Sequence, residues 1–123
     1  MAKLLLTITE PAYGKQRFVT AYRFAMRART DDHHVKIVLL EDAVSVVKEG
    51  QKVTELPGVM HEISPNCEDL VKAAVKAGIE IFACGTCLKE RGLNQTEIID
   101  GVELMNIGQF LDFVIDADKV INF

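Results

Sequence analysis

Apolar residues in the chain occur in short continuous runs that alternate with longer amphipathic stretches. Five runs consist mainly of strand-forming residues and are largely apolar throughout, as in strands whose two faces are both buried. These runs span residues 3–9, 35–40, 79–84, 102–106 and 119–123. Because helix-like segments separate them, the pattern predicts parallel strands joined by helical crossovers.

The amphipathic stretches predict the helices. Between the first two runs, five apolar residues fall on one helical face: Phe18, Ala21, Tyr22, Ala25 and Met26. Segment 64–78 has Ser64 as the expected N-cap, Pro65 as the first helical residue and Gly78 just after the end. Shorter helices are expected over 43–50, 85–92 and 95–100. The last helix is expected to turn five residues inward: Ile107, Phe110, Phe113, Val114 and Ala117.

This order of elements predicts an α/β fold. We expect one domain over residues 1–123, built on a parallel sheet of about five strands with helices on both faces, in three α/β/α layers. Residues 51–63, which include Met60 and His61, lack a regular period and contain Pro57-Gly58. They are expected to form a long loop that covers the site or, in preference, makes a subunit contact.

Composition narrows the function. The net charge of −4 among 123 residues argues against nucleic acid or an anionic membrane as partner. No run has the length of a membrane span, and the N-terminal apolar run is too short for a signal peptide, so a cytoplasmic location is expected. Three cysteines in that compartment point to redox, metal or nucleophile chemistry rather than a structural disulfide set.

A ligand site is expected where the carboxyl ends of the strands meet. The residues that follow these ends and carry chemistry are Tyr13, Gly14, Asp42, Cys84, Thr86, Cys87 and Asn106. Although they are far apart in sequence, the topology predicts that they converge.

The segment "CGTC" is the centre of this expected site. Cys84 ends a strand and Cys87 is expected in the first helical turn, where free N–H groups favour a thiolate and lower its pKa. Gly85 is expected to allow a sharp turn that leaves the thiol uncovered, while Lys89 and Arg91 add positive charge. Cys67, on the inward face of its helix, is interpreted as a core residue.

Other motifs are excluded by spacing. A tyrosine-phosphatase loop needs arginine six places after its cysteine, where this chain has Glu90 or Leu93. The glycine patterns of dinucleotide sites and P-loops are absent. Zinc would need Cys67 and His61 beside the cysteine pair, and we expect no metal or other cofactor. A thioredoxin-type dithiol stays open, because Cys-x-x-Cys at a helix start is its signature.

Taken together, several segments resemble a known family. "CGTCLKERGL", the following "IIDGVELMNIGQFLDFVIDADKVINF", "PAYG" and "EDAV" resemble the YchN-like branch of the DsrE/DsrF sulfur-relay family over nearly the whole chain. The resemblance implies a parallel α/β fold, assembly into homotrimers or homohexamers, and a site at subunit edges. It also implies that a cysteine carries sulfane sulfur as a persulfide between donor and acceptor proteins.

By its distance from Arg91-Gly92, Cys84 matches the sulfur carrier, and Cys87 is the additional cysteine of the branch. Relay members with an assigned role generally lack that second cysteine, which could resolve the persulfide as a Cys84–Cys87 disulfide. The expected substrate-binding residues around the pair are Tyr13, Gly14, Asp42, Gly85, Thr86 and Arg91. Two alternatives to sulfur relay stay open: a dithiol oxidoreductase and a non-enzymatic oligomeric binding module.

Overall fold

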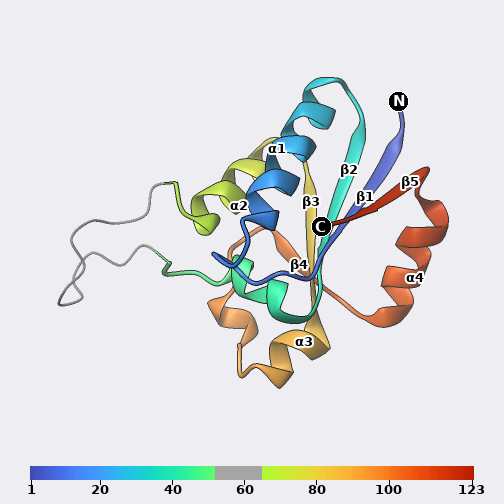
Figure 1. Cartoon of the computed structure of the whole chain (residues 1–123). Helices are drawn as coiled ribbons and strands as arrows, with labels where there is room; N and C mark the ends of the chain where they lie inside the picture. Colours follow the sequence, from blue (N-terminus) through green and yellow to red (C-terminus); the bar gives the residue numbers. More distant parts are fainter. Residues whose placement is uncertain (52–64) are drawn as a thin grey trace.

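The computed structural model describes residues 1–51 and 65–123 and contains a five-stranded parallel sheet (Figure 1). The strands are β1 (Lys3–Ile8), β2 (His34–Leu39), β3 (Glu80–Cys84), β4 (Val102–Met105) and β5 (Lys119–Asn122), in the order β4-β3-β2-β1-β5. The helices are α1 (Arg17–Thr30), α2 (Cys67–Lys76), α3 (Gly85–Glu90) and α4 (Ile107–Asp116), with 3₁₀ turns η1 (Glu41–Val47) and η2 (Gln95–Glu97). The predicted α/β class and parallel sheet are confirmed.

The two faces of the sheet are covered unequally. The larger core lies on the face covered by α1, α2 and η1, where Ile37, Leu39 and Val71 are fully buried. The opposite face carries a small core around Val38 and Phe82, against which α4 packs. Three layers are therefore present, as expected, but within residues 1–51 and 65–123 one outer layer is a single helix.

Helix α4 corrects part of the predicted inward face. Phe113 packs on Phe82 with ring centroids 4.6 Å apart, and Phe110 and Ala117 contact the same small core. Ile107 and Val114, also expected inward, are exposed, Ile107 by 78%. The helix is apolar on two sides, and periodicity alone could not show which side meets the sheet.

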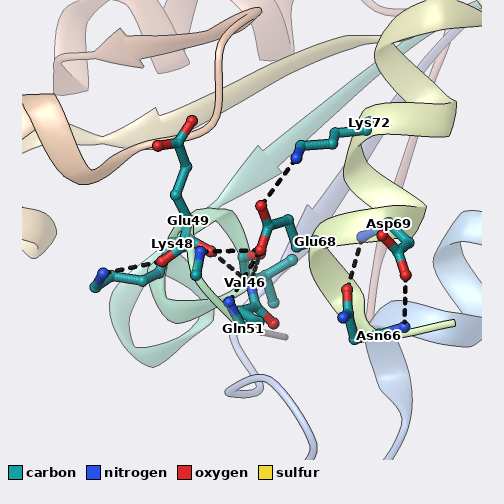
Figure 2. Close-up of polar contacts among 9 residues, drawn as sticks. Val46, Lys48, Glu49, Gln51, Asn66, Glu68, Asp69 and Lys72 are labelled. Atoms are coloured by element: carbon teal, nitrogen blue, oxygen red, sulfur yellow. Dashed lines mark hydrogen bonds and ion pairs between the residues drawn. The ribbon is translucent and has the colours of Figure 1, made fainter. Parts of the chain in front are cut away.

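The start of α2 also differs from the prediction. Asn66, not Ser64, is the N-cap: its side chain accepts a 2.8 Å hydrogen bond from the Asp69 N–H, and the Asp69 carboxylate accepts one from the Asn66 N–H (Figure 2). Pro65 therefore precedes the helix. Ser64, and the predicted loop residues Met60 and His61, lie outside the described residues. The Gly78 stop is confirmed, since Gly78 follows the C-cap Ala77 with a φ of +89°.

Glu68, in the first turn of α2, binds the backbone of Gly50 and Gln51, at the end of the first described range (Figure 2). Its Oε1 accepts the N–H groups of Gly50 and Gln51, each at 2.9 Å, and its Oε2 lies 2.9 Å from Lys72 Nζ. The Gln51 side chain in turn donates to the carbonyl of Val46. This network fixes the end of η1 to the start of α2.

Candidate functional site

Cys84 is both the last residue of β3 and the N-cap of α3. Side chains alternate along β3, so Cys84 shares the α4 side of the sheet with Phe82 and packs partly against the small core. Its Sγ accepts a 3.4 Å hydrogen bond from the backbone N–H of Cys87. The side chain is partly exposed. The position at a strand end is the one predicted from the sequence.

Cys87 is held by three polar contacts. Its N–H donates to Cys84 Sγ, its own Sγ accepts a 3.1 Å hydrogen bond from the Glu41 N–H, and its carbonyl accepts one of 3.1 Å from Arg91 Nη1. Its side chain packs partly against the larger core. Both cysteines are free thiols. Both side chains contact the larger core, and Cys84 also contacts the small core on the α4 side of the sheet.

The pKa of the Cys87 thiol is raised above its ordinary value, which corrects the expectation of a lowered one. Partial burial is the main cause, and hydrogen bonding and charge shared with the Cys84 sulfur act in the same direction. The Glu41 N–H and the Arg91 guanidinium lower the pKa, but they do not outweigh these two effects. The Cys87 thiol therefore holds its proton more strongly than an ordinary cysteine does.

Asp42 and Arg91 form an ion pair beside the cysteines. Arg91 Nε and Nη2 both lie 2.9 Å from Asp42 Oδ1, which links η1 to the end of α3. The sequence predicted both residues for the site, and the structure brings them together with Cys87. The charged groups of Asp42 and Arg91 face each other, and Arg91 also donates to the Cys87 carbonyl. The ion pair therefore positions the cysteine turn.

The two residues between the cysteines have different surroundings. Thr86 is exposed at the edge of the site. Gly85 does not have the positive φ that would favour glycine, and a Cβ there would lie 3.7 Å from the Met105 carbonyl oxygen, an ordinary contact. The expectation that the turn needs the conformational freedom of Gly85 is therefore wrong.

Tyr13 and Gly14 line a different pocket, of about 320 Å³, together with Cys67. The Tyr13 hydroxyl accepts the Cys67 N–H at 3.0 Å and donates to Gln51 Oε1 at 2.6 Å. Burial is the main cause that raises the pKa of both the Tyr13 hydroxyl and the Cys67 thiol. The described hydrogen bonds of Tyr13 thus lead to α2 and to the segment after η1, not to the cysteine turn. Cys67 is buried, as predicted.

Asn106 also has a structural role. It is the N-cap of α4, where its side chain accepts the Gln109 N–H at 2.8 Å and the Gln109 side chain accepts the Asn106 N–H at 3.0 Å. Its position after β4 suggested a ligand contact, but its polar groups serve the helix start. A Gln three residues downstream was the sequence signal for this capping box.

Glu41 is the residue of the site that the sequence analysis missed. Its φ of +54° is in the left-handed region, and its backbone N–H points at Cys87 Sγ. The contact comes from the main chain, so the residue type gave no signal for it. Glutamate is also not a residue type that favours this region.

Residues 1–51 and 65–123 contain no group of three or more His, Cys, Asp or Glu side chains with metal-binding proximity. His61, which the sequence offered as a zinc ligand, lies outside them. Within the same ranges, no helix combines the length and apolar character needed to cross a bilayer.

Fold and site together define a class: parallel α/β proteins with a cysteine turn at the carboxyl end of the third strand. Residues 2–123 match the DsrE/DsrF-like family, and the chain belongs to that family. The predicted resemblance is confirmed.

Similar proteins support the assignment over the full length. An uncharacterized protein of Methanopyrus kandleri, MK0008, is 37% identical over 98% of this chain and 93% of its own. Protein YchN of Escherichia coli K12 is 26% identical over the whole of both chains. The crystal structure of the E. coli ychN protein superimposes with a TM-score of 0.86, at 25% identity and full coverage of both chains.

Proposed function

We propose that this protein is a sulfur-relay carrier that holds sulfane sulfur as a persulfide on Cys84. The observation that carries the proposal is the partly exposed Cys84 sulfur at the end of β3, which receives the Cys87 N–H. Membership of the DsrE/DsrF-like family supports sulfur-relay chemistry of this type. Cys87 is the accessory thiol.

Loading requires one exchange between sulfur atoms. The Cys84 thiolate attacks the outer sulfur of a donor persulfide, a new S–S bond forms at Cys84, and the donor leaves as a thiolate. The Cys87 N–H faces Cys84 Sγ and so stabilises the thiolate that makes this attack. No metal or other cofactor enters this step.

The test is intact-mass measurement after incubation with inorganic polysulfide. The expected product is one added sulfur atom in the wild type and in Cys67→Ala, and none in Cys84→Ser. An adduct that persists in Cys84→Ser would contradict the assignment of the carrier. Cys67→Ala is the matched control, because it removes a thiol from outside the cysteine turn.

A dithiol oxidoreductase is the second candidate, favoured by the contact between Cys87 N–H and Cys84 Sγ. It requires a reversible Cys84–Cys87 disulfide, with two electrons and two protons lost on oxidation. A redox titration followed by alkylation mass analysis distinguishes the two functions. A carrier without dithiol activity shows no reversible Cys84–Cys87 disulfide at the reduction potentials of a reducing cell compartment.

We also propose that the protein is a homo-oligomer, a trimer or hexamer, that buries the outer side of α4. This side carries a stripe of exposed apolar side chains at helical spacing: Ile107, Leu111, Val114 and Ile115. Leu111 is 58% exposed and Ile115 is 73% exposed. An apolar stripe of this size on a helix that already packs its other side on the sheet is typical of an interface. Cys84 lies on the same side of the sheet as α4, so the interface would approach the sulfur site.

A further inference from the structure

Helix α3, which presents the Cys87 N–H to Cys84 Sγ, is too short to be stable alone. It has six residues, and isolated helices shorter than about 12–15 residues are marginal in water. Its end is also irregular, because the Arg91 N–H donates to the Leu88 carbonyl, three residues back, as in a 3₁₀ turn. The position of the N–H that faces Cys84 therefore depends on contacts from elsewhere in the fold.

These contacts come from η1 and end at Cys87. The Glu41 N–H donates to Cys87 Sγ at 3.1 Å. The Cys87 carbonyl accepts Arg91 Nη1 at 3.1 Å, and the same guanidinium places Nε and Nη2 at 2.9 Å from Asp42 Oδ1. Cys87 is thus held at its side chain and at its carbonyl, while its N–H points at Cys84 Sγ.

The Arg91 side chain can join two partners because of its shape. A guanidinium is planar and carries its donors in a fixed fork. Nε and Nη2 are engaged by Asp42, and Nη1 by the Cys87 carbonyl. The carboxylate therefore sets the plane of the guanidinium, and that plane directs Nη1 to Cys87.

We infer that Asp42 is a positioning residue for Cys84, which acts through Arg91 and Cys87 to keep a hydrogen-bond donor on the Cys84 sulfur. The inference rests on the proposed function, in which Cys84 is the sulfur carrier. The sequence suggested Asp42 as a substrate contact. Its Oδ1 instead binds Arg91, so its effect on the reaction is expected through the geometry of the cysteine turn.

The positioned donor would act in both halves of the relay. On loading, the Cys84 thiolate is the attacking group. On delivery, an acceptor thiolate attacks the outer sulfur of the Cys84 persulfide, the S–S bond at Cys84 breaks, and its electron pair stays on Cys84 Sγ. The Cys87 N–H faces this atom, and a donor that is already in place lowers the barrier to both steps.

Geometry and charge predict opposite effects for the loss of Asp42. Asp42→Ala removes a negative charge beside the cysteine turn, and by charge alone this change would make the Cys84 thiolate more stable. If Asp42 acts by position, the same variant releases Arg91 and then Cys87, and the thiolate becomes less stable. The direction of the change at Cys84 therefore separates the two effects.

Two further variants complete the test. Arg91→Lys keeps the positive charge but has a single nitrogen, which cannot hold Asp42 and the Cys87 carbonyl in the same fixed geometry. Asp31→Ala is the matched control, because Asp31 pairs with Arg27 at the same distance of 2.9 Å, at the end of α1 far from α3 (Figure 1). Exposed ion pairs contribute little to stability, so all three variants should melt as the wild type does.

The experiment measures alkylation of Cys84 by iodoacetamide across pH, with Cys84 and Cys87 adducts separated by peptide mass analysis. We expect Asp42→Ala to move the midpoint of the Cys84 profile to higher pH and to lower its rate at pH 7 about threefold, as for loss of one hydrogen bond, without lowering the high-pH plateau. Arg91→Lys should give a shift in the same direction, and Asp31→Ala none.

Three outcomes would overturn the inference: an unchanged midpoint in Asp42→Ala, a midpoint at lower pH, or a lower plateau with the wild-type midpoint. The last would report access to Cys84 and not its thiolate. Loading with inorganic polysulfide, followed by mass analysis, tests the proposed function separately. If the wild type gains no sulfur while the midpoint shift is present, the proposed function fails and the positioning role stands. If loading succeeds and the shift is absent, the positioning role fails alone.

Discussion

The Tyr13 hydroxyl oxygen lies 3.0 Å from the backbone nitrogen of Cys67, a residue 54 positions later in the chain. The same hydroxyl donates to Gln51 Oε1, so one oxygen joins the β1–α1 loop, the segment that follows η1 and the start of α2. Tyr13 also has a φ of +63°. A residue chosen from the sequence as a substrate contact thus connects three segments of the fold.

Removing that hydroxyl should destabilise the fold. Tyr13→Phe leaves the Cys67 N–H and Gln51 Oε1 without this partner, and we expect the free energy of unfolding to fall by about 1–2 kcal/mol. Urea denaturation followed by circular dichroism measures the change. Tyr22→Phe is the control, because the Tyr22 hydroxyl makes no hydrogen bond with another described residue, and a loss equal to that of Tyr13→Phe would contradict the prediction.

Glu68 should make stability depend on pH. Its pKa is lowered from the ordinary 4.5, mainly by the hydrogen bond from Lys72 and further by the N–H groups of Gln51 and Gly50, while burial opposes the shift. A carboxyl group with a lowered pKa stabilises the fold above its ordinary pKa, and this contribution is lost as the pH falls toward the lowered value. Glu68 is thus expected to contribute fully at pH 7.

The measurement compares the wild type with Glu68→Gln. We expect a difference of about 1–2 kcal/mol in the free energy of unfolding at pH 7, shrinking as the pH drops below 4.5. Glu103→Gln, which changes an exposed carboxylate, should show no such trend. If the difference in the free energy of unfolding stayed constant with pH, the charge of Glu68 would make no contribution to stability.

Replacing Asp32 by glycine should stabilise the fold. It follows α1 in the left-handed region, with a φ of +66°, where the His33 N–H donates to the Ala28 carbonyl and the Asp32 N–H to the Arg29 carbonyl. A non-glycine residue pays about 1–2 kcal/mol for this conformation, which exceeds the roughly 0.4–1 kcal/mol of extra chain entropy that glycine brings. We expect Asp32→Gly to raise the free energy of unfolding by about 0.5 kcal/mol.

The control for that variant is Asp32→Asn. It removes the negative charge near the carboxyl end of α1 but keeps the Cβ, so it measures the electrostatic part alone. Thermal and urea unfolding of both variants would separate the two contributions. A glycine variant no more stable than the asparagine variant would show that the left-handed conformation carries no cost here.

The outer side of α4 should control assembly. We expect Leu111→Glu to convert the oligomer to a monomer, because it places a charge at the centre of the apolar stripe that the interface would bury. Size-exclusion chromatography with light scattering gives the mass. Val19→Glu, at an exposed apolar position on α1, should leave the mass unchanged. A wild-type protein that is already a monomer would contradict the proposed assembly.

The sequence predicted β1, β2 and β3 well because these three strands are mostly apolar and buried, a property that few other segments share. It placed Cys84 and Cys87 correctly because both follow directly from the end of a strand. It could not separate the two apolar sides of α4, since Ile107 and Phe110 are equally apolar. Nor could it show that Asn106 caps a helix or that the Glu41 main chain faces a sulfur, because both depend on local backbone geometry.

The pairing of β5 with β1 has a consequence for biosynthesis. β1 lies between β2 and β5, and Leu4 is paired with Lys119, Leu6 with Ile121 and Thr7 with Asn122. The Asn122 side chain also donates to the Thr7 hydroxyl at 2.8 Å. While a ribosome is still translating the middle of the chain, one edge of β1 therefore has no neighbour, and contacts of such long separation form slowly. The nascent protein must keep that edge from pairing elsewhere until the codons of β5 have been translated.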